Sequence, residues 1–155
     1  LAARIAAGSV AVAKSFDPAQ FDGRRRPWVG FLESITRSAN RGLAQPNWET
    51  LFNSTKALAE NREDFEGTLR IGYLLLRDLE ILCALGKSGD IANVDILPHL
   101  KAWSDQLGLR GVERLKEGLD QAYRQQVRNV NQQLGFESLA VDILAAAPTT
   151  PGRDS

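Results

Sequence analysis

The sequence predicts an all-α protein, an antiparallel helical bundle of about six helices. Apolar residues recur at helical spacing along most of the chain of 155 residues. No stretch shows the two-residue alternation, rich in β-branched and aromatic residues, that is typical of strands. Gly, Pro or Asn residues separate the helical patterns and indicate turns between them. A chain of this length buries enough surface to form a core without disulfides or metal ions.

The N-terminal region contains two interruptions. Gly8 and Ser9 break an apolar helical pattern over residues 1–16, and serine is suited to cap a new helix there. Residues 17–27 combine an Asp-Pro start, a glycine and a second proline, which predicts a short helix followed by a hinge, or a linker. We therefore expect a domain boundary in this segment.

Two amphipathic helices are expected next. One begins at Trp28 and ends near Gly42, with its apolar residues on one face. The second begins at Trp48, with Asn47 as the N-cap and Glu49 in the first turn, where the helix dipole favours an anion.

The third helix, about residues 62–86, is the most apolar part of the chain, which predicts a position at the centre of the bundle. Gly86 is expected to end it. Arg77 and Asp78 lie inside this helix, and a charged pair there must reach solvent, a buried partner or another subunit. Emergence of both residues at a wet edge is the simple alternative, and we take the pair as candidates for a subunit interface.

Short stretches of polar residues mark the ends of the remaining helices. Asp95 is the expected cap of a fourth helix, with Pro98 in its first turn and an end near Gly108. A fifth, charged amphipathic helix follows, and a sixth, apolar helix begins after an asparagine-rich turn. In this turn Asn129 can end one helix in the left-handed conformation, and Asn131 is a suitable N-cap for the next.

Composition excludes several classes of function. The chain has 19 basic and 19 acidic residues, so no strong net field draws it to nucleic acid or to a membrane. Its single cysteine, Cys83, cannot form an internal disulfide or a cysteine zinc cluster, which suits a cytoplasmic protein. The single histidine, His99, has no second metal donor at helical reach. No phosphate-binding loop, dinucleotide motif or serine elbow is present. We therefore expect no catalytic residues, no cofactor, no metal and no membrane span.

A DNA-binding helical module is the alternative. Arg24 to Arg26, with Arg37 and Arg41, are the residues that could form its positive face, although arginines beside a hinge are usually solvated. Three tryptophans lack the adjacent basic residues of a base-stacking platform and are expected in the core. They are Trp28, Trp48 and Trp103.

The order of four segments resembles the C-terminal part of the bacterial DNA polymerase III delta-prime subunit family, with its gamma/tau relatives. The segments are LAARIAAGSVAVA, YLLLRDLEIL, IANVDIL and RNVNQQLGFESLAVDIL, and the resemblance covers about residues 1–146. It implies a subunit of the clamp loader, the ATP-driven ring that opens the sliding clamp and places it on primed DNA. The fold then implied is a helical collar that follows the lid of an AAA+ module.

This resemblance implies three regions: the end of the lid over residues 1–22, the collar over 23–146, and a polar tail, 147–155, that we expect to be disordered. Gly8 and Ser9 would mark the lid turn, which lacks the nucleotide-sensing arginine of active relatives. The chain would then be a non-catalytic part of a longer subunit of a DNA-directed DNA polymerase holoenzyme. Its partners would be the gamma/tau and delta subunits, with DNA reached only indirectly. Such assembly predicts an apolar patch that stays exposed on the isolated domain.

Overall fold

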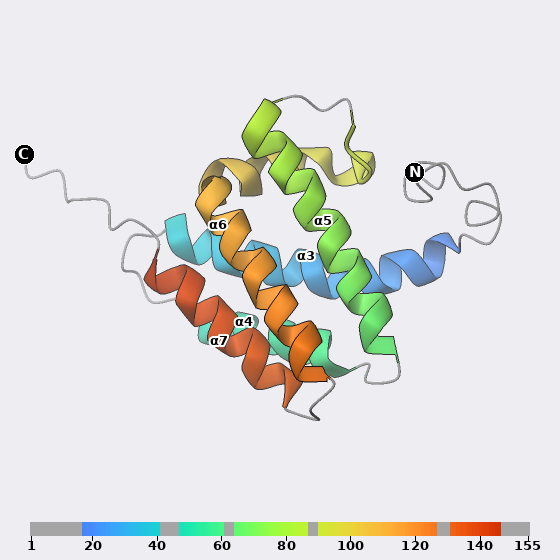
Figure 1. Ribbon diagram of the computed structural model, residues 1–155, viewed down its shortest axis with the longest axis vertical. Helices are drawn as coiled ribbons and strands as arrows, with labels where there is room; N and C mark the ends of the chain where they lie inside the picture. Colours follow the sequence, from blue (N-terminus) through green and yellow to red (C-terminus); the bar gives the residue numbers. More distant parts are fainter. Residues whose placement is uncertain (1–16, 41–46, 61–63, 87–89, 127–130, 147–155) are drawn as a thin grey trace, which may run out of the picture.

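The computed structural model describes residues 17–40, 47–60, 64–86, 90–126 and 131–146. Within these ranges the chain forms five α-helices and one short 3-10 helix, with no strand, and they pack as a compact helical bundle (Figure 1). The prediction of an all-α fold is therefore confirmed.

The helices follow one another with short connections. They are α3 (Pro18–Asn40), α4 (Trp48–Glu60), α5 (Phe65–Leu85), the 3-10 helix η2 (Val94–Ile96), α6 (Leu97–Gln126) and α7 (Gln132–Ala145). In Figure 1, α5, the second part of α6 and α7 run side by side, and α3 crosses behind them. Helix α4 packs against α3 and α7 and closes the bundle on that side.

The central helix is α3, which contacts α4, α5, α6 and α7. The prediction that the most apolar helix lies at the centre was wrong, because α5 packs mainly against α6 and α3 and keeps one face exposed. Leu85 near the end of α5 is 64% exposed. The contact between α5 and α3 is close at Gly72, where a Cβ atom would lie 2.6 Å from Cζ2 of Trp28. The apolar residues of α5 are thus buried against α6 and α3, while one face of the helix stays exposed.

Helix α3 continues without interruption through Pro27. The hinge or linker expected over residues 17–27 was therefore wrong, and the predicted boundary between 22 and 23 falls inside this helix. Asp17 begins α3 by accepting a hydrogen bond from the backbone N–H of Ala19 at 2.9 Å. Because Pro27 has no backbone N–H, the carbonyl of Gly23, four residues earlier, lacks its helical hydrogen-bond donor. Gly23 is exposed, so water can reach this carbonyl instead.

One buried stripe runs along α3 on both sides of the proline and explains why the helix does not break. Its spacing of four, three, four and three residues is that of a continuous helix face. The stripe consists of Phe21, Arg25, Trp28, Leu32 and Ile35.

Several predicted helix ends are confirmed. Asn47 accepts a hydrogen bond from the backbone N–H of Thr50 at 3.1 Å and caps α4. Gly86 ends α5 in the left-handed conformation, with φ of 60°. Gly108 has φ of 61° and ψ of 177° and divides α6 into two helical segments, where the sequence predicted two helices. Asp95 was wrong as a cap, because it lies within η2 and its carboxylate contacts Arg25 instead.

Asn131 is the N-cap of α7, as predicted, and its side chain accepts a hydrogen bond from the backbone N–H of Gln133 at 3.1 Å. Replacing Asn131 with alanine is expected to lower the free energy of unfolding by about 1 kcal/mol, because this donor loses its partner. Urea denaturation followed by circular dichroism measures the change. Replacement with aspartate keeps the acceptor and should restore most of the loss, and equal stability of the alanine variant and the parent would contradict the cap. The other predicted cap, Asn129, lies outside the described residues.

An aromatic cluster fills the space between α3, α5 and α7. Phe136 of α7 is fully buried and packs edge-on against Trp28 and Phe31 of α3, with ring centroids 5.6 and 6.3 Å away. The indole N–H of Trp28 donates a hydrogen bond to the carbonyl of Thr68 at 2.7 Å. Two of the three tryptophans, Trp28 and Trp103, lie in the core as predicted. The third does not, as described below.

Candidate functional site

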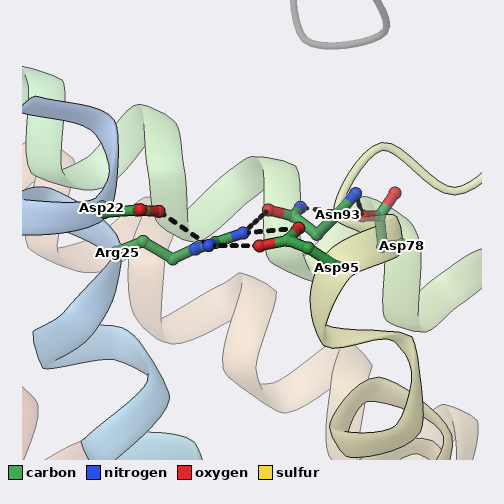
Figure 2. Close-up of polar contacts among 5 residues, drawn as sticks. All are labelled: Asp22, Arg25, Asp78, Asn93 and Asp95. Atoms are coloured by element: carbon green, nitrogen blue, oxygen red, sulfur yellow. Dashed lines mark hydrogen bonds and ion pairs between the residues drawn. The ribbon is translucent and has the colours of Figure 1, made fainter. Parts of the chain in front are cut away.

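The main cluster of buried polar groups centres on the guanidinium of Arg25 (Figure 2). Its Nη1 donates to Oδ1 of Asp95 at 2.9 Å and to Oδ1 of Asn93 at 3.2 Å. Its Nη2 donates to Oδ2 of Asp95 at 2.6 Å and to Oδ1 of Asp22 at 2.7 Å. The fork of the guanidinium therefore holds Asp95 with two parallel bonds, the strongest geometry for such a pair.

The cluster continues from Asn93 to Asp78, which has no exposed surface. The Asp78 carboxylate accepts hydrogen bonds from the backbone N–H groups of Ala92 at 3.0 Å and Asn93 at 2.8 Å, and from the Asn93 amide Nδ2 at 2.8 Å. Arg77 lies beside it, half-exposed, with Nη1 3.5 Å from Oδ1 of Asp78. Of the alternatives weighed for this pair, Asp78 has a buried partner and Arg77 reaches solvent. A subunit contact through them stays a prediction.

Electrostatics favour the ionised forms of Arg25 and Asp95. The hydrogen bonds from Arg25 hold the pKa of Asp95 below its ordinary value. Burial acts to lower the pKa of Arg25, but the hydrogen bonds and charges of Asp95 and Asp22 outweigh it and raise that pKa. The cluster thus fixes the segment around η2 against α3 and α5. Its acidic side chains are engaged in hydrogen bonds within the chain, an arrangement that suits a structural role and not acid–base catalysis.

The lowered pKa of Asp95 should make the free energy of unfolding depend on pH under acidic conditions. A carboxyl whose pKa is lowered by folding contributes stability above its unfolded pKa of about 3.9 and loses it as the pH falls through the folded pKa. Replacing Asp95 with asparagine should therefore lower the melting temperature at pH 7, and the difference from the parent should shrink as the pH falls below about 4. Thermal unfolding between pH 7 and 3 measures it. A difference that stays constant across this range would contradict the ion pair, and Asp105→Asn, at an exposed position of α6, is the control.

A second polar contact joins α5 to α6. The Tyr73 hydroxyl donates to Oδ1 of Asp120 at 2.5 Å, and burial together with this bond raises the pKa of Tyr73 to about 12. The chain has two tyrosines, so after Tyr123→Phe the phenol of Tyr73 is the single source of the tyrosinate absorbance. Absorbance at the tyrosinate band should then titrate with a midpoint near 12, and the further change Asp120→Ala should move it toward 10. A midpoint near 10 without that change would contradict the contact.

The arginines of the DNA-binding alternative are largely engaged within the chain. Arg24 forms an ion pair with Asp64, and Arg25 is buried in the cluster described above. Arg26 is exposed, and Arg37 is exposed with its Nη2 3.8 Å from Glu33. Arg41 lies outside the described residues. Of the four arginines that the structure describes, Arg24 and Arg25 are therefore paired with carboxylates and add no free charge to such a face.

The remaining predicted residues are dispersed. His99 is exposed, its ring is tilted by 41° against that of Trp103 with the centroids 5.8 Å apart, and its Nδ1 lies 3.5 Å from Oε1 of Glu33. Cys83 is half-buried, and burial raises the pKa of its thiol. Gly8 and Ser9 lie outside the described residues. In the part of the chain that the structure describes, no group of three or more His, Cys, Asp or Glu side chains is arranged to hold a metal ion.

Several large hydrophobic side chains lie at the surface, where the sequence pattern did not predict them. Trp48, expected in the core, is 49% exposed, and Phe52, four residues later on α4, is 52% exposed. On α7, Leu134 is 59% and Val141 is 46% exposed. The sequence of α4 contains more apolar residues than its packing needs, because Trp48 and Phe52 come in addition to a buried stripe that already packs the helix against the bundle. That stripe consists of Leu51, Thr55 and Leu58.

The searches for similar proteins define no family. Comparison with models of protein families, with curated protein sequences and with solved structures found no match. Among the helices that the structure describes, none combines the length and the hydropathy needed to cross a bilayer. The class established for this chain is therefore a compact helical bundle.

Proposed function

We propose that the chain is a non-catalytic assembly domain that binds other protein subunits through exposed apolar side chains. The observation that carries the proposal is the pair Trp48 and Phe52, which lie one turn apart on α4 and are each about half exposed. Large aromatic residues that stay exposed and adjacent are typical of protein interfaces, where they act as anchors. The buried polar groups of the chain serve its own packing, which is consistent with a scaffold.

The particular assembly that we propose is the clamp loader of bacterial DNA polymerase III, with this chain as the collar of a delta-prime-like subunit. Support comes from two of the four segments that carry the resemblance, because they contact each other in the part of the chain that the structure describes. Asp78 of YLLLRDLEIL binds Asn93 of IANVDIL through two hydrogen bonds. Phe136 of RNVNQQLGFESLAVDIL packs against the aromatic residues of α3 and α5. YLLLRDLEIL and IANVDIL are thus joined by buried hydrogen bonds, and the third described segment is anchored in the same core. The lid that the resemblance implies stays a prediction, and its boundary cannot lie between residues 22 and 23, because α3 runs through them.

Co-purification of the chain with the gamma/tau and delta subunits tests the proposal. The parent chain should form a complex and should neither bind nor hydrolyse ATP by itself. The double change Trp48→Ser and Phe52→Ser should weaken the complex roughly thirtyfold, equivalent to about 2 kcal/mol for the loss of an interface anchor. Leu85→Ser is the matched control, because Leu85 is an exposed apolar residue on another helix.

Two results would count against the proposal. Failure of the parent chain to bind any clamp-loader subunit would reject this particular assembly. Binding that is unaffected by the changes at Trp48 and Phe52 but lost in the Leu85 control would reject the proposed face.

The DNA-binding alternative has less support, because Arg24 and Arg25 already contact carboxylates. It predicts that the chain alone binds duplex DNA with an affinity that falls steeply with salt. Fluorescence anisotropy with a labelled duplex at two salt concentrations separates the two proposals.

A further inference from the structure

A groove of about 400 Å³ lies between the second segment of α6 and α7. Six residues of α6 line it, together with five residues of α7 and its N-cap Asn131, at the same spacings of 3, 4, 7, 8 and 11 residues counted from Arg114 and from Asn131. Each set is therefore one continuous face of its helix, and the groove follows both helices for three turns. At about 1.5 Å per residue these faces are roughly 16 Å long.

Small residues form the floor of the groove and set how the helices pair. At Gly118 a Cβ atom would collide with the side chain of Leu139, and at Gly135 it would lie 3.2 Å from Oε1 of Gln125. Residue 118 is thus opposite 139 and residue 125 is near 135, which is an antiparallel pairing. Arg114 therefore lies toward the end of the groove where α7 presents Asp142, and Asn131 lies toward the other end.

The walls carry side chains whose hydrogen-bonding groups are not used within the described part of the chain. Gln121, Gln125 and Ser138 line the groove and make no hydrogen bond to any described residue. The face of α6 that meets α5 differs, since Lys116 binds Glu80 at 2.9 Å and Asp120 accepts from Tyr73. Carboxamide side chains offer both a donor and an acceptor, the pair of groups that a peptide bond also presents.

The two ends of the groove differ in chemistry. Arg114, Glu117 and Asp142 line one end, and together they leave one excess negative charge. Leu134 lines the other end and is 59% exposed. A ligand that matches both ends has a cationic group at one end and an apolar group at the other.

We propose that this groove binds an extended polypeptide segment of another protein, about five residues long at roughly 3.3 Å per residue, with a basic side chain at one end and an apolar one at the other. The backbone of the segment meets the carboxamides of Gln121 and Gln125, and its basic side chain lies against Glu117 and Asp142. The groove is separate from Trp48 and Phe52, so this inference goes beyond the proposed assembly and does not depend on the clamp loader.

The test uses the whole chain and four fluorescein-labelled pentapeptides. Two have leucine at one end, lysine at the other and serine between them, one in each direction, and two have glutamate in place of lysine. Fluorescence anisotropy should show saturable binding for one lysine peptide, about two- to fivefold tighter than its glutamate counterpart, as expected for one exposed charge pair. Amide chemical shifts of α6 and α7 should move during the titration.

Three variants locate the binding. Ser138→Trp fills the groove from an exposed position and should abolish binding, while Asp142→Lys should reverse the preference toward the glutamate peptide. Glu113→Lys makes the same charge change on exposed surface of α6 outside the groove and should leave binding unchanged. Circular dichroism establishes that each variant is folded. Binding of no peptide up to about 1 mM, a limit of roughly 4 kcal/mol, or equal binding by Ser138→Trp and the parent, would overturn the inference.

Discussion

Replacing Asp78 with alanine is expected to lower the free energy of unfolding by about 3–5 kcal/mol. The carboxylate has no exposed surface and accepts three hydrogen bonds, two from backbone N–H groups and one from Asn93. Alanine would leave all three donors buried without a partner, and water has no access to replace the acceptor. Arg25 would lose part of its support as well, because it bonds to Asn93. Urea denaturation followed by circular dichroism at 222 nm measures the loss.

Two controls separate this role from a contact with another subunit. Arg77→Ala removes the exposed neighbour of Asp78 and should change stability by less than about 1 kcal/mol. Asp78→Asn keeps one acceptor oxygen in nearly the same shape and should fall between the alanine variant and the parent. If Asp78 acted mainly at a subunit interface, Asp78→Ala would unfold at the same urea concentration as the parent and would lose assembly alone. That result would contradict the structural role.

Local patterns in the sequence predicted the fold class and most helix ends. Asn47 and Asn131 cap their helices, Gly86 ends α5, and Gly108 divides α6, because each end depends on the side chain or backbone freedom of one residue. Such signals are contained within a few residues. A tertiary contact can still override one of them, as at Asp95, whose carboxylate binds Arg25 instead of capping a helix.

The continuity of α3 could not be predicted in this way. Its buried stripe includes Arg25, and a charged residue at a core position does not fit an apolar pattern. The position becomes acceptable only because Asn93 and Asp95, about 70 residues further along the chain, supply acceptors for the guanidinium. The sequence contains both partners but not their proximity. The glycine and proline nearby then favoured a hinge where the folded chain has a helix.

The candidate surfaces were missed for a related reason. A helix with more apolar residues than one face can bury must leave some exposed, but its sequence does not say which. On α4, Leu51 and Leu58 are buried in the core, and Trp48 remains at the surface. The groove between α6 and α7 depends on Gly118 and Gly135 facing the partner helix, which follows from the antiparallel pairing alone. Both features arise from packing between helices, so the pattern of one helix cannot reveal them.

Replacing Phe136 with alanine is the second change with a large expected effect, about 3–5 kcal/mol in the free energy of unfolding. Phe136 is fully buried, and its ring lies 5.6 Å from that of Trp28 and 6.1 Å from that of Phe65. It is the aromatic side chain by which α7 enters the core between α3 and α5. Truncation removes its buried area and leaves a cavity that neighbours on α3 and α5 must close, and the edge-on aromatic contacts are lost as well. Urea denaturation measures the change.

Control variants and hydrogen exchange show where the loss acts. Phe136→Leu keeps most of the volume and should cost less than the alanine change, and Val141→Ala, on the exposed face of α7, should stay within about 0.5 kcal/mol of the parent. Amide exchange should accelerate first in α7 of Phe136→Ala, because this helix opens when its anchor is lost. The proposed peptide groove would open with it, since α7 forms one wall. A loss below about 1 kcal/mol, with α7 amides as protected as in the parent, would mean that α7 is held by its other contacts.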